Sequence, residues 1–173
     1  MLQSISDFLV ATNIADYVGS HDWVWPLGEI LHFFGMATLI GTVGLVDARI
    51  LGIGKGIPIS ALEKLVPLGV LGFILNAATG LVFIAGNPIG GPMEYLTNLS
   101  FQIKMILIFV AALNLLAFYV FGISRAADAV SPDGDAPGSA KIVAVVSLVV
   151  WFGVIIFGRL IMYNDTLLTT LGL

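Results

Sequence analysis

The stretch VWPLGEILHFFGMATLIGTVGLV, residues 24–46, decides the fold of this chain. Glu29 and His32 are its only ionisable side chains. A helix needs about 20 apolar residues to cross the hydrocarbon core of a bilayer, so the stretch predicts a membrane-spanning helix. An ionisable side chain at mid-bilayer costs roughly 2.5–3.5 kcal/mol and persists where a partner, a cavity or a ligand offsets that cost. These two residues are therefore the first candidates for a functional site.

The composition of the whole chain is that of an integral membrane protein. Of its 173 residues, 58% are hydrophobic and 10% are charged, and the mean hydropathy is +1.05. A soluble domain carries about 25% charged residues. The lack of cysteine excludes disulfides and thiolate metal sites. A net charge of −4 without a basic block argues against a nucleic-acid partner.

Three further segments, residues 65–85, 101–121 and 142–162, are also apolar and long enough to span a bilayer. The gaps between the four segments are too short to hold a soluble domain. We therefore predict an all-α fold, an integral membrane four-helix bundle that forms one domain over residues 1–173. The N-terminus lacks the basic region of a signal peptide, so we interpret it as mature sequence.

Lysine and arginine predict the orientation, because they accumulate in cytoplasmic loops. The loop after the first span and the loop after the third span hold five of the seven cations: Arg49, Lys55, Lys64, Arg125 and Lys141. The termini and the loop around residues 86–100 carry acidic residues instead. We therefore expect both termini outside and these two loops in the cytoplasm, with the chain in the bacterial inner membrane.

Three connecting segments carry predictions of their own. The first twenty residues place Ile5 and Phe8 on one helical face, which predicts an N-terminal interfacial helix. The segment ISALEKL has Ser60 and Glu63 at the spacing of a capping box, so the second span is expected to begin there. Residues 124–141 are polar and contain proline and glycine, which predicts a flexible cytoplasmic linker.

Four ionisable side chains are expected to meet at one level of the bundle. In the predicted orientation, Glu29 and His32 of the first span, Lys104 of the third and Arg159 of the fourth all lie in the outer third of the membrane. The cations have an alternative role, because each can extend to the interface from its helix end. A second alternative is that Glu29 and His32 pair with the cations and only hold the helices together.

The first span also carries a flat surface. At about 100° per residue, Gly28, His32 and Gly35 share a narrow arc of the helix. A planar cofactor can lie on such a face with the imidazole reaching its metal, and haem iron is commonly held by histidine. Haem propionates would suit Lys104 and Arg159. The alternative is that the glycines only allow close helix packing. We expect that role for the second span, where Gly69, Gly72, Asn76 and Gly80 form a face of small residues.

Two other metal sites can be weighed on ligand count. Glu29 and His32 have the spacing of a di-iron helix, but that site needs a second such pair and further glutamates, which the spans lack. A di-iron site within one chain is therefore excluded. His32 and Met36, with a further methionine as a soft ligand, are a possible copper pair.

Three short segments resemble a known group of membrane proteins. They are GLVDARIL (44–51) at the end of the first span, FQIKMILI (101–108) at the start of the third and FGRLIMY (157–163) at the end of the fourth. Their order, after an early histidine, resembles an uncharacterised family of small four-helix bacterial inner-membrane proteins. That family is itself similar to the copper-resistance protein D domain and to the haem-containing bacterial protoporphyrinogen oxidase.

The resemblance implies roles for three residues. His32 matches a haem or copper ligand, Arg49 matches an arginine at the cytoplasmic end, and Lys104 matches a lysine of the third span. The oxidase-like proteins carry further histidines in their helices, whereas His32 is the only histidine in the predicted spans. A haem would therefore need a methionine ligand, a five-coordinate iron or a second subunit.

Three functions remain open on these grounds. The first is a b-type haem protein for electron transfer, with His32 as axial ligand and Glu29 as a proton or hydrogen-bond partner of the site. The second is a copper-handling or copper-transport protein using His32 and Met36. The third is a cofactor-free structural subunit. The expected partners are the lipid bilayer, a quinone or a periplasmic redox or metal protein, and further copies of the chain in a homo-oligomer.

Overall fold

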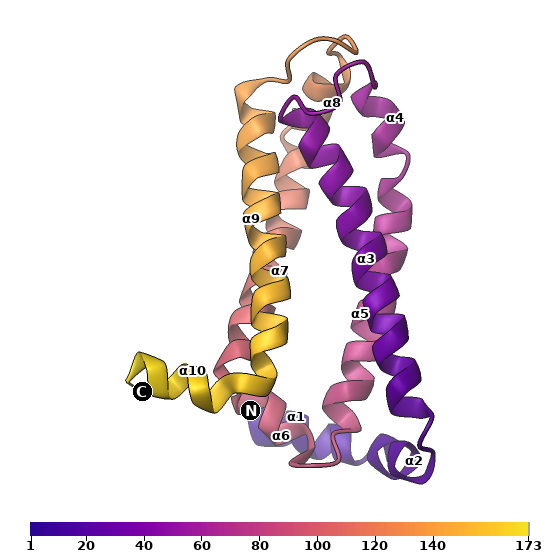
Figure 1. The fold of residues 1–173 in the computed structure, drawn as a ribbon, viewed down its shortest axis with the longest axis vertical. Coiled ribbons are helices and arrows are strands. Elements are labelled where there is room, and N and C mark those ends of the chain that lie inside the picture. Colours follow the sequence, from indigo (N-terminus) through magenta and orange to yellow (C-terminus); the bar gives the residue numbers. More distant parts are fainter. Residues whose placement is uncertain (173) are drawn as a thin grey trace.

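The chain is predominantly helical in the part that the structure describes, residues 1–172 of a computed structural model (Figure 1). Ten α-helices follow one another: α1 (Leu2–Val10), α2 (Ile14–Ser20), α3 (Val24–Ile50), α4 (Ile59–Glu63), α5 (Val66–Ala85), α6 (Gly91–Thr97), α7 (Leu99–Val120), α8 (Ile123–Asp128), α9 (Gly138–Leu160) and α10 (Asn164–Leu171). A short 3-10 turn, Ile161–Tyr163, joins the last two. The predicted all-α class is therefore confirmed.

Four of these helices, α3, α5, α7 and α9, are long and apolar enough to cross a membrane. They coincide with the four predicted segments, with differences at their ends. One difference matters for function, because α3 runs to Ile50 and not to residue 46 as predicted. Helix ends are the part of a helix that a sequence pattern defines least well, because they fray and their assignment varies by one or two residues.

The long helices form two antiparallel pairs. α3 packs along α5, α7 packs along α9, and α3 also contacts α9, which joins the pairs. The pairs approach each other at one end of the molecule and diverge toward the other end (Figure 1). α5 and α7 are not among the closely packed pairs.

Glycines bring α3 and α5 into backbone contact. A Cβ added at Gly72 would lie 2.7 Å from the Gly35 carbonyl oxygen and 2.9 Å from the Leu39 nitrogen. A Cβ at Gly35 would lie 2.8 Å from the Gly72 carbonyl oxygen. The predicted close-packing role is therefore confirmed for Gly35 and Gly72. It does not extend to Gly80, where an added Cβ would approach only the His32 ring, at 3.9 Å.

Most of the lysines and arginines lie at the end where the pairs meet, which we call the basic end. Two loops there, 51–58 and 129–137, cover a buried cluster that includes Ile50, Ile59 and Phe118. Arg49 is 1% exposed and binds both loops. Its Nε donates to the Ile57 carbonyl at 2.7 Å, and its Nη2 donates to the carbonyls of Pro132 and Gly134. The two loops are thus held to each other through one side chain.

The prediction of a flexible linker over residues 124–141 was therefore wrong. The segment begins in α8, follows a path fixed by Arg49 and by the hydrogen bond from the Gly56 nitrogen to the Pro132 carbonyl, and enters α9 at Gly138. The proline and glycine content predicted a turn-rich segment correctly. It gave no indication that Arg49, far away in the sequence, fixes the path of this segment.

An exposed ion cluster adds a pH-dependent contact at the same end. Asp135 lies 3.2 Å from Lys55 and 3.5 Å from Lys141. The hydrogen bond from Lys55 and the charge of Lys141 hold the pKa of Asp135 below its ordinary value of 3.8. A carboxylate with a lowered folded-state pKa stabilises the fold above its unfolded-state pKa, and this effect is lost as the pH falls through the folded-state value.

We therefore expect Asp135→Asn to lower the unfolding temperature slightly near neutral pH and not at all well below pH 3.8. The effect should be small, and salt should reduce it, because both partners face solvent. Circular dichroism melts of the detergent-solubilised protein at the two pH values measure it. An equal difference at both would contradict the ion-pair origin.

The opposite end, which we call the terminal end, holds the N-terminus and α10 (Figure 1). The structure does not support a single N-terminal interfacial helix. Asn13, with a φ of 58°, breaks the segment into α1, which packs on α6, and α2, which packs on α5. Of its large apolar side chains Val18 is buried, whereas Ile5 and Phe8 are exposed.

Helix capping also differs from the expectation. The predicted capping box is wrong, because α4 begins at Ile59 after Pro58, has no side-chain cap, and places Ser60 inside the helix. A side-chain cap is present instead at α7, where Asn98 Oδ1 accepts from the Phe101 nitrogen at 3.1 Å. The Asn98 amide also donates to the Ile161 carbonyl at 3.0 Å, which ties the start of α7 to the end of α9.

Candidate functional site

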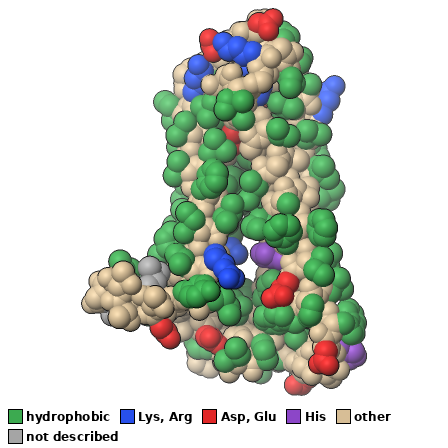
Figure 2. Space-filling model, in the orientation of Figure 1, with side chains coloured by type: hydrophobic (Ala, Val, Ile, Leu, Met, Phe, Trp, Pro, Cys, Tyr) green, Lys and Arg blue, Asp and Glu red, His purple; other side chains and the backbone are tan. Residues whose placement is uncertain are grey.

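The space between the two helix pairs is the candidate site. Toward the terminal end the surface is hollowed between the pairs, and basic, acidic and histidine side chains gather around the hollow (Figure 2). Toward the basic end, where the pairs meet, the space is an apolar cavity. The site thus has two levels, an outer polar level and an inner apolar level.

On the α3 side of the outer level, the predicted residues bind neighbours within their own helix pair. The Trp25 indole nitrogen donates to the Glu29 carboxylate at 3.1 Å. His32 Nδ1 lies 2.8 Å from the Thr79 hydroxyl of α5, and the imidazole packs beside the Phe83 ring with centroids 5.4 Å apart. His32 therefore lies against α5.

The cations of the outer level belong to the other pair. Lys104 of α7 crosses over Gly158 of α9, where an added Cβ would lie 3.5 Å from its Nζ. Arg159 is exposed, and its guanidinium carbon lies 5.6 Å from the centre of the Tyr163 ring. The structure thus places the four predicted residues toward the same end of the molecule. The ion pairs found in residues 1–172 do not include them.

A half-buried phenol, that of Tyr95, lies near this level in α6. Burial raises the pKa of Tyr95, and the carboxylates of Glu94 and Glu29 raise it further. The phenol therefore stays protonated over the physiological pH range, which makes it a donor and not an anion.

The flat glycine face predicted for a planar cofactor is covered by α5. A Cβ at Gly28 would lie 3.0 Å from the Phe83 ring, and Gly35 is in contact with Gly72 and Asn76. A haem on this face would have to displace α5, so the residues do not fit haem there. Haem b with His32 as its axial ligand stays a prediction, and it would need a face of α3 other than this one.

The copper assignment rests on fewer ligands than a metal site usually has. Met36 lies one turn beyond His32 on α3. Within residues 1–172, groups of three or more His, Asp or Glu side chains placed to hold one metal ion are not found. Methionine ligands are outside that criterion, so the pair His32 and Met36 stays a prediction.

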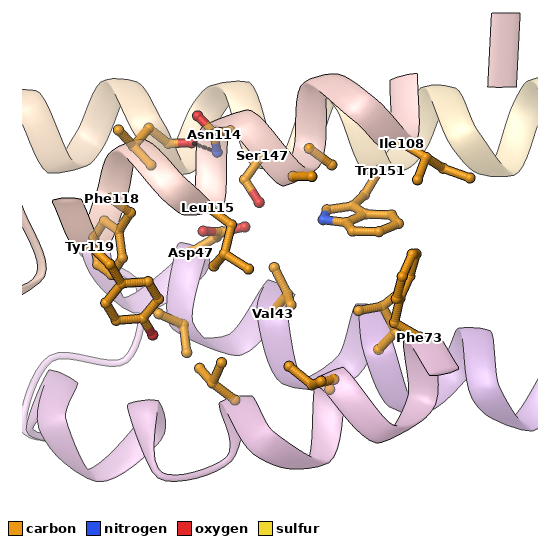
Figure 3. Close-up of a pocket in the computed structure, with 18 of the residues that line it drawn as sticks. Val43, Asp47, Phe73, Ile108, Asn114, Leu115, Phe118, Tyr119, Ser147 and Trp151 are labelled. Carbon is orange, nitrogen blue, oxygen red and sulfur yellow. Dashed lines mark hydrogen bonds between the residues drawn. The ribbon is translucent and has the colours of Figure 1, made fainter. Parts of the chain in front are cut away.

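The inner level is a cavity of about 250 Å³ between all four long helices (Figure 3). Its walls are almost entirely aliphatic and aromatic. The lining side chains that define it include Leu39, Val43, Val46 and Ile50 of α3, Val66, Val70 and Phe73 of α5, Ile108, Ala111, Ala112, Leu115, Phe118 and Tyr119 of α7, and Val143 and Trp151 of α9. On the side between α5 and α7 the lining residues Val70, Phe73, Leu115 and Tyr119 are also exposed to the outside, so the cavity opens there.

Three polar residues lie in this apolar wall. Asp47 of α3 is 6% exposed, and Ser147 of α9 lies beside it (Figure 3). Asn114 of α7 donates its amide to the Val143 carbonyl of α9 at 3.1 Å, which leaves the amide oxygen as an acceptor. These three polar residues thus lie on the basic-end side of Trp151 and Phe73.

No family model, characterised protein or solved structure matches this chain. The resemblance to the copper-resistance protein D domain and to the haem-containing protoporphyrinogen oxidase therefore stays a prediction. The site has to be interpreted from its own geometry.

Sequence reasoning missed Asp47, because the predicted span ended one residue before it. The prediction ended the first span at residue 46, which placed Asp47 in a cytoplasmic loop beside Arg49. The structure continues α3 to Ile50, so Asp47 lies inside the helix with its side chain in the cavity.

Two aromatic residues mark the outer limit of the cavity. Trp151 and Phe73 face each other across that end of the space (Figure 3). Each is the lining residue of its helix nearest the terminal end. Together they separate the apolar cavity from the polar outer level.

Proposed function

We propose that this chain is an integral membrane protein that binds a lipophilic small molecule between its two helix pairs. The observation that carries the proposal is the cavity of about 250 Å³ between four apolar helices. Cavities of this kind are typical of small-molecule sites, which are mostly apolar and contain a few placed polar groups.

Membrane insertion is part of the proposal and is supported by the exposed surface. The long helices expose large apolar side chains over their length, among them Phe34, Leu71, Phe109 and Phe152, each more than 60% exposed. Contiguous apolar surface of this size is not stable in water and suits lipid. Lysine and arginine collect at one end (Figure 2), which supports a cytoplasmic basic end in a bacterial inner membrane.

The open side of the cavity supports a ligand that arrives from the bilayer. The gap between α5 and α7 faces the surroundings of the helices, and its walls are apolar. A molecule dissolved in lipid would enter the cavity without crossing water. An apolar cavity of about 150 Å³ is enough to bind benzene, so the present cavity has room for a substituted aromatic ring.

Trp151 in the cavity wall supplies the test. In the variant Trp23→Phe/Trp25→Phe, Trp151 is the only tryptophan. We expect 4-bromotoluene, a neutral heavy-atom quencher, to quench its fluorescence in a saturable manner in lipid nanodiscs. Ala112→Phe in the cavity wall should weaken this binding by about tenfold or more, because the added ring fills the space.

Ala37→Phe is the matched control. Ala37 is exposed on α3 and does not line the cavity, so the same substitution there should leave the titration unchanged. Quenching that rises linearly with probe concentration in every variant would overturn the proposal, because it indicates partition into lipid alone.

A further inference from the structure

One carboxylate in the cavity has an oxygen without a hydrogen-bond partner among the described residues, although the Ser147 hydroxyl bonds to the same carboxyl group. Asp47 is 6% exposed, and its Oδ2 has no hydrogen-bond donor among the described residues. Buried polar atoms are nearly always paired in native proteins, so each exception calls for an explanation. An unpaired buried carboxylate at membrane depth is especially costly.

The chain provides no cation for this carboxylate. The residues that line the cavity include no lysine, arginine or histidine. Arg49 follows Asp47 by two residues, but its guanidinium binds the carbonyls of Ile57 and Pro132 at the basic end. The ion pairs in residues 1–172 all involve Asp135. A positive charge that complements Asp47 would have to come from a bound molecule.

The remainder of the cavity suits the rest of such a molecule. Trp151, Phe73 and Phe118 present aromatic rings to the same space. Aromatic faces attract organic cations, and tryptophan does so most strongly. The aliphatic walls accommodate an apolar body, while the Ser147 hydroxyl beside Asp47 is a second polar group for a donor.

We infer that the lipophilic ligand is an organic cation, an amine whose protonated nitrogen binds Asp47 while its apolar body fills the cavity. This inference rests on the proposed function, because it names the class of ligand for the same cavity. A neutral hydrocarbon would leave Asp47 unpaired, and an anionic lipid would repel it.

A matched set of probes tests the inference in the Trp151-only variant. 4-Bromobenzylamine is protonated at neutral pH, 4-bromotoluene is neutral, and 4-bromobenzaldehyde carries only an acceptor. We expect the amine to bind about tenfold to a hundredfold more tightly than 4-bromotoluene, as a hydrogen bond between charged groups allows. The binding is measured by Trp151 quenching in nanodiscs made of uncharged lipid, so that the lipid does not concentrate the cation.

Asp47→Asn removes the charge and keeps the shape. It should abolish the preference for the amine while leaving the affinity for 4-bromotoluene within about twofold, and this unchanged affinity shows that the variant is folded. Asp16→Asn, at an exposed acidic residue of α2, should leave both affinities unchanged.

The outcomes separate the inference from the proposed function. Saturable binding of 4-bromotoluene with no preference for the amine, or an amine preference that survives in Asp47→Asn, would overturn the cation assignment while the cavity function stands. A preference for 4-bromobenzaldehyde would overturn it too, because it shows that Asp47 donates a proton to an acceptor. Saturable binding of no probe would overturn both.

Discussion

Gly72→Ala is expected to unfold the protein at a markedly lower temperature, with a loss of about 3 kcal/mol of stability or more, at the upper end of overpacking effects. The added methyl group would meet two backbone atoms of α3, the Gly35 oxygen at 2.7 Å and the Leu39 nitrogen at 2.9 Å. Backbone atoms within a helix cannot move aside as a side chain can. α3 and α5 would have to move apart, and the contact between them that shapes one wall of the cavity would be lost.

Gly41→Ala is the matched control, in α3 itself. A Cβ at Gly41 would meet nothing within 4 Å. Alanine is also a better helix former than glycine by about 0.8–1 kcal/mol, so this variant should be as stable as the wild type or more so. Thermal melts of both variants in the same detergent make the comparison. Equal melting of Gly72→Ala and Gly41→Ala would contradict the backbone contact between α3 and α5.

The four long helices could be predicted from sequence because hydrophobicity is a local property. Each apolar stretch is recognisable without knowing its neighbours, and the positions of α5, α7 and α9 agree with their predicted segments to within a few residues. Which helices pack against each other was harder to predict from the sequence. Glycine at positions 35 and 72 was compatible with both a cofactor face and a packing face, and only the position of α5 decides between them.

The contacts of the polar residues were also hard to predict, because they too depend on how distant segments pack. Glu29 and His32 stand out in the sequence because they interrupt an apolar stretch, yet their hydrogen bonds go to Trp25 and Thr79 within one helix pair. Asp47 does not stand out, because it lies next to Arg49 in a segment that has the appearance of a loop. Its isolation follows from the direction of the arginine, which turns toward Ile57 and Pro132, and this depends on contacts far apart in the sequence.

Arg49→Ala is the second substitution from which we expect a large effect. The guanidinium is 1% exposed and supplies the donors for carbonyls in both loops of the basic end. Removing the donor from a buried carbonyl costs about 1–3 kcal/mol for each group left unsatisfied, so the loss of Arg49 affects several such groups at once. Arg49→Lys should give an intermediate loss, because an ammonium keeps the charge but lacks the planar fork that reaches two loops at once. The order of unfolding temperatures should be wild type, Arg49→Lys, Arg49→Ala.

A second measurement locates the effect. When Arg49 is removed, loop 129–137 loses its side-chain anchor, so an endoprotease that cuts before aspartate should cleave at Asp133 and Asp135 much faster than in the wild type. Arg125→Ala is the control, because Arg125 is exposed at the same end of the molecule and its loss should change neither the melt nor the cleavage. If Arg49→Ala lowered the melting temperature but left cleavage at the wild-type rate, its role would lie in packing at the end of α3 and not in holding the two loops. Faster cleavage in Arg49→Ala alone would show that one buried arginine closes the basic end over the cavity.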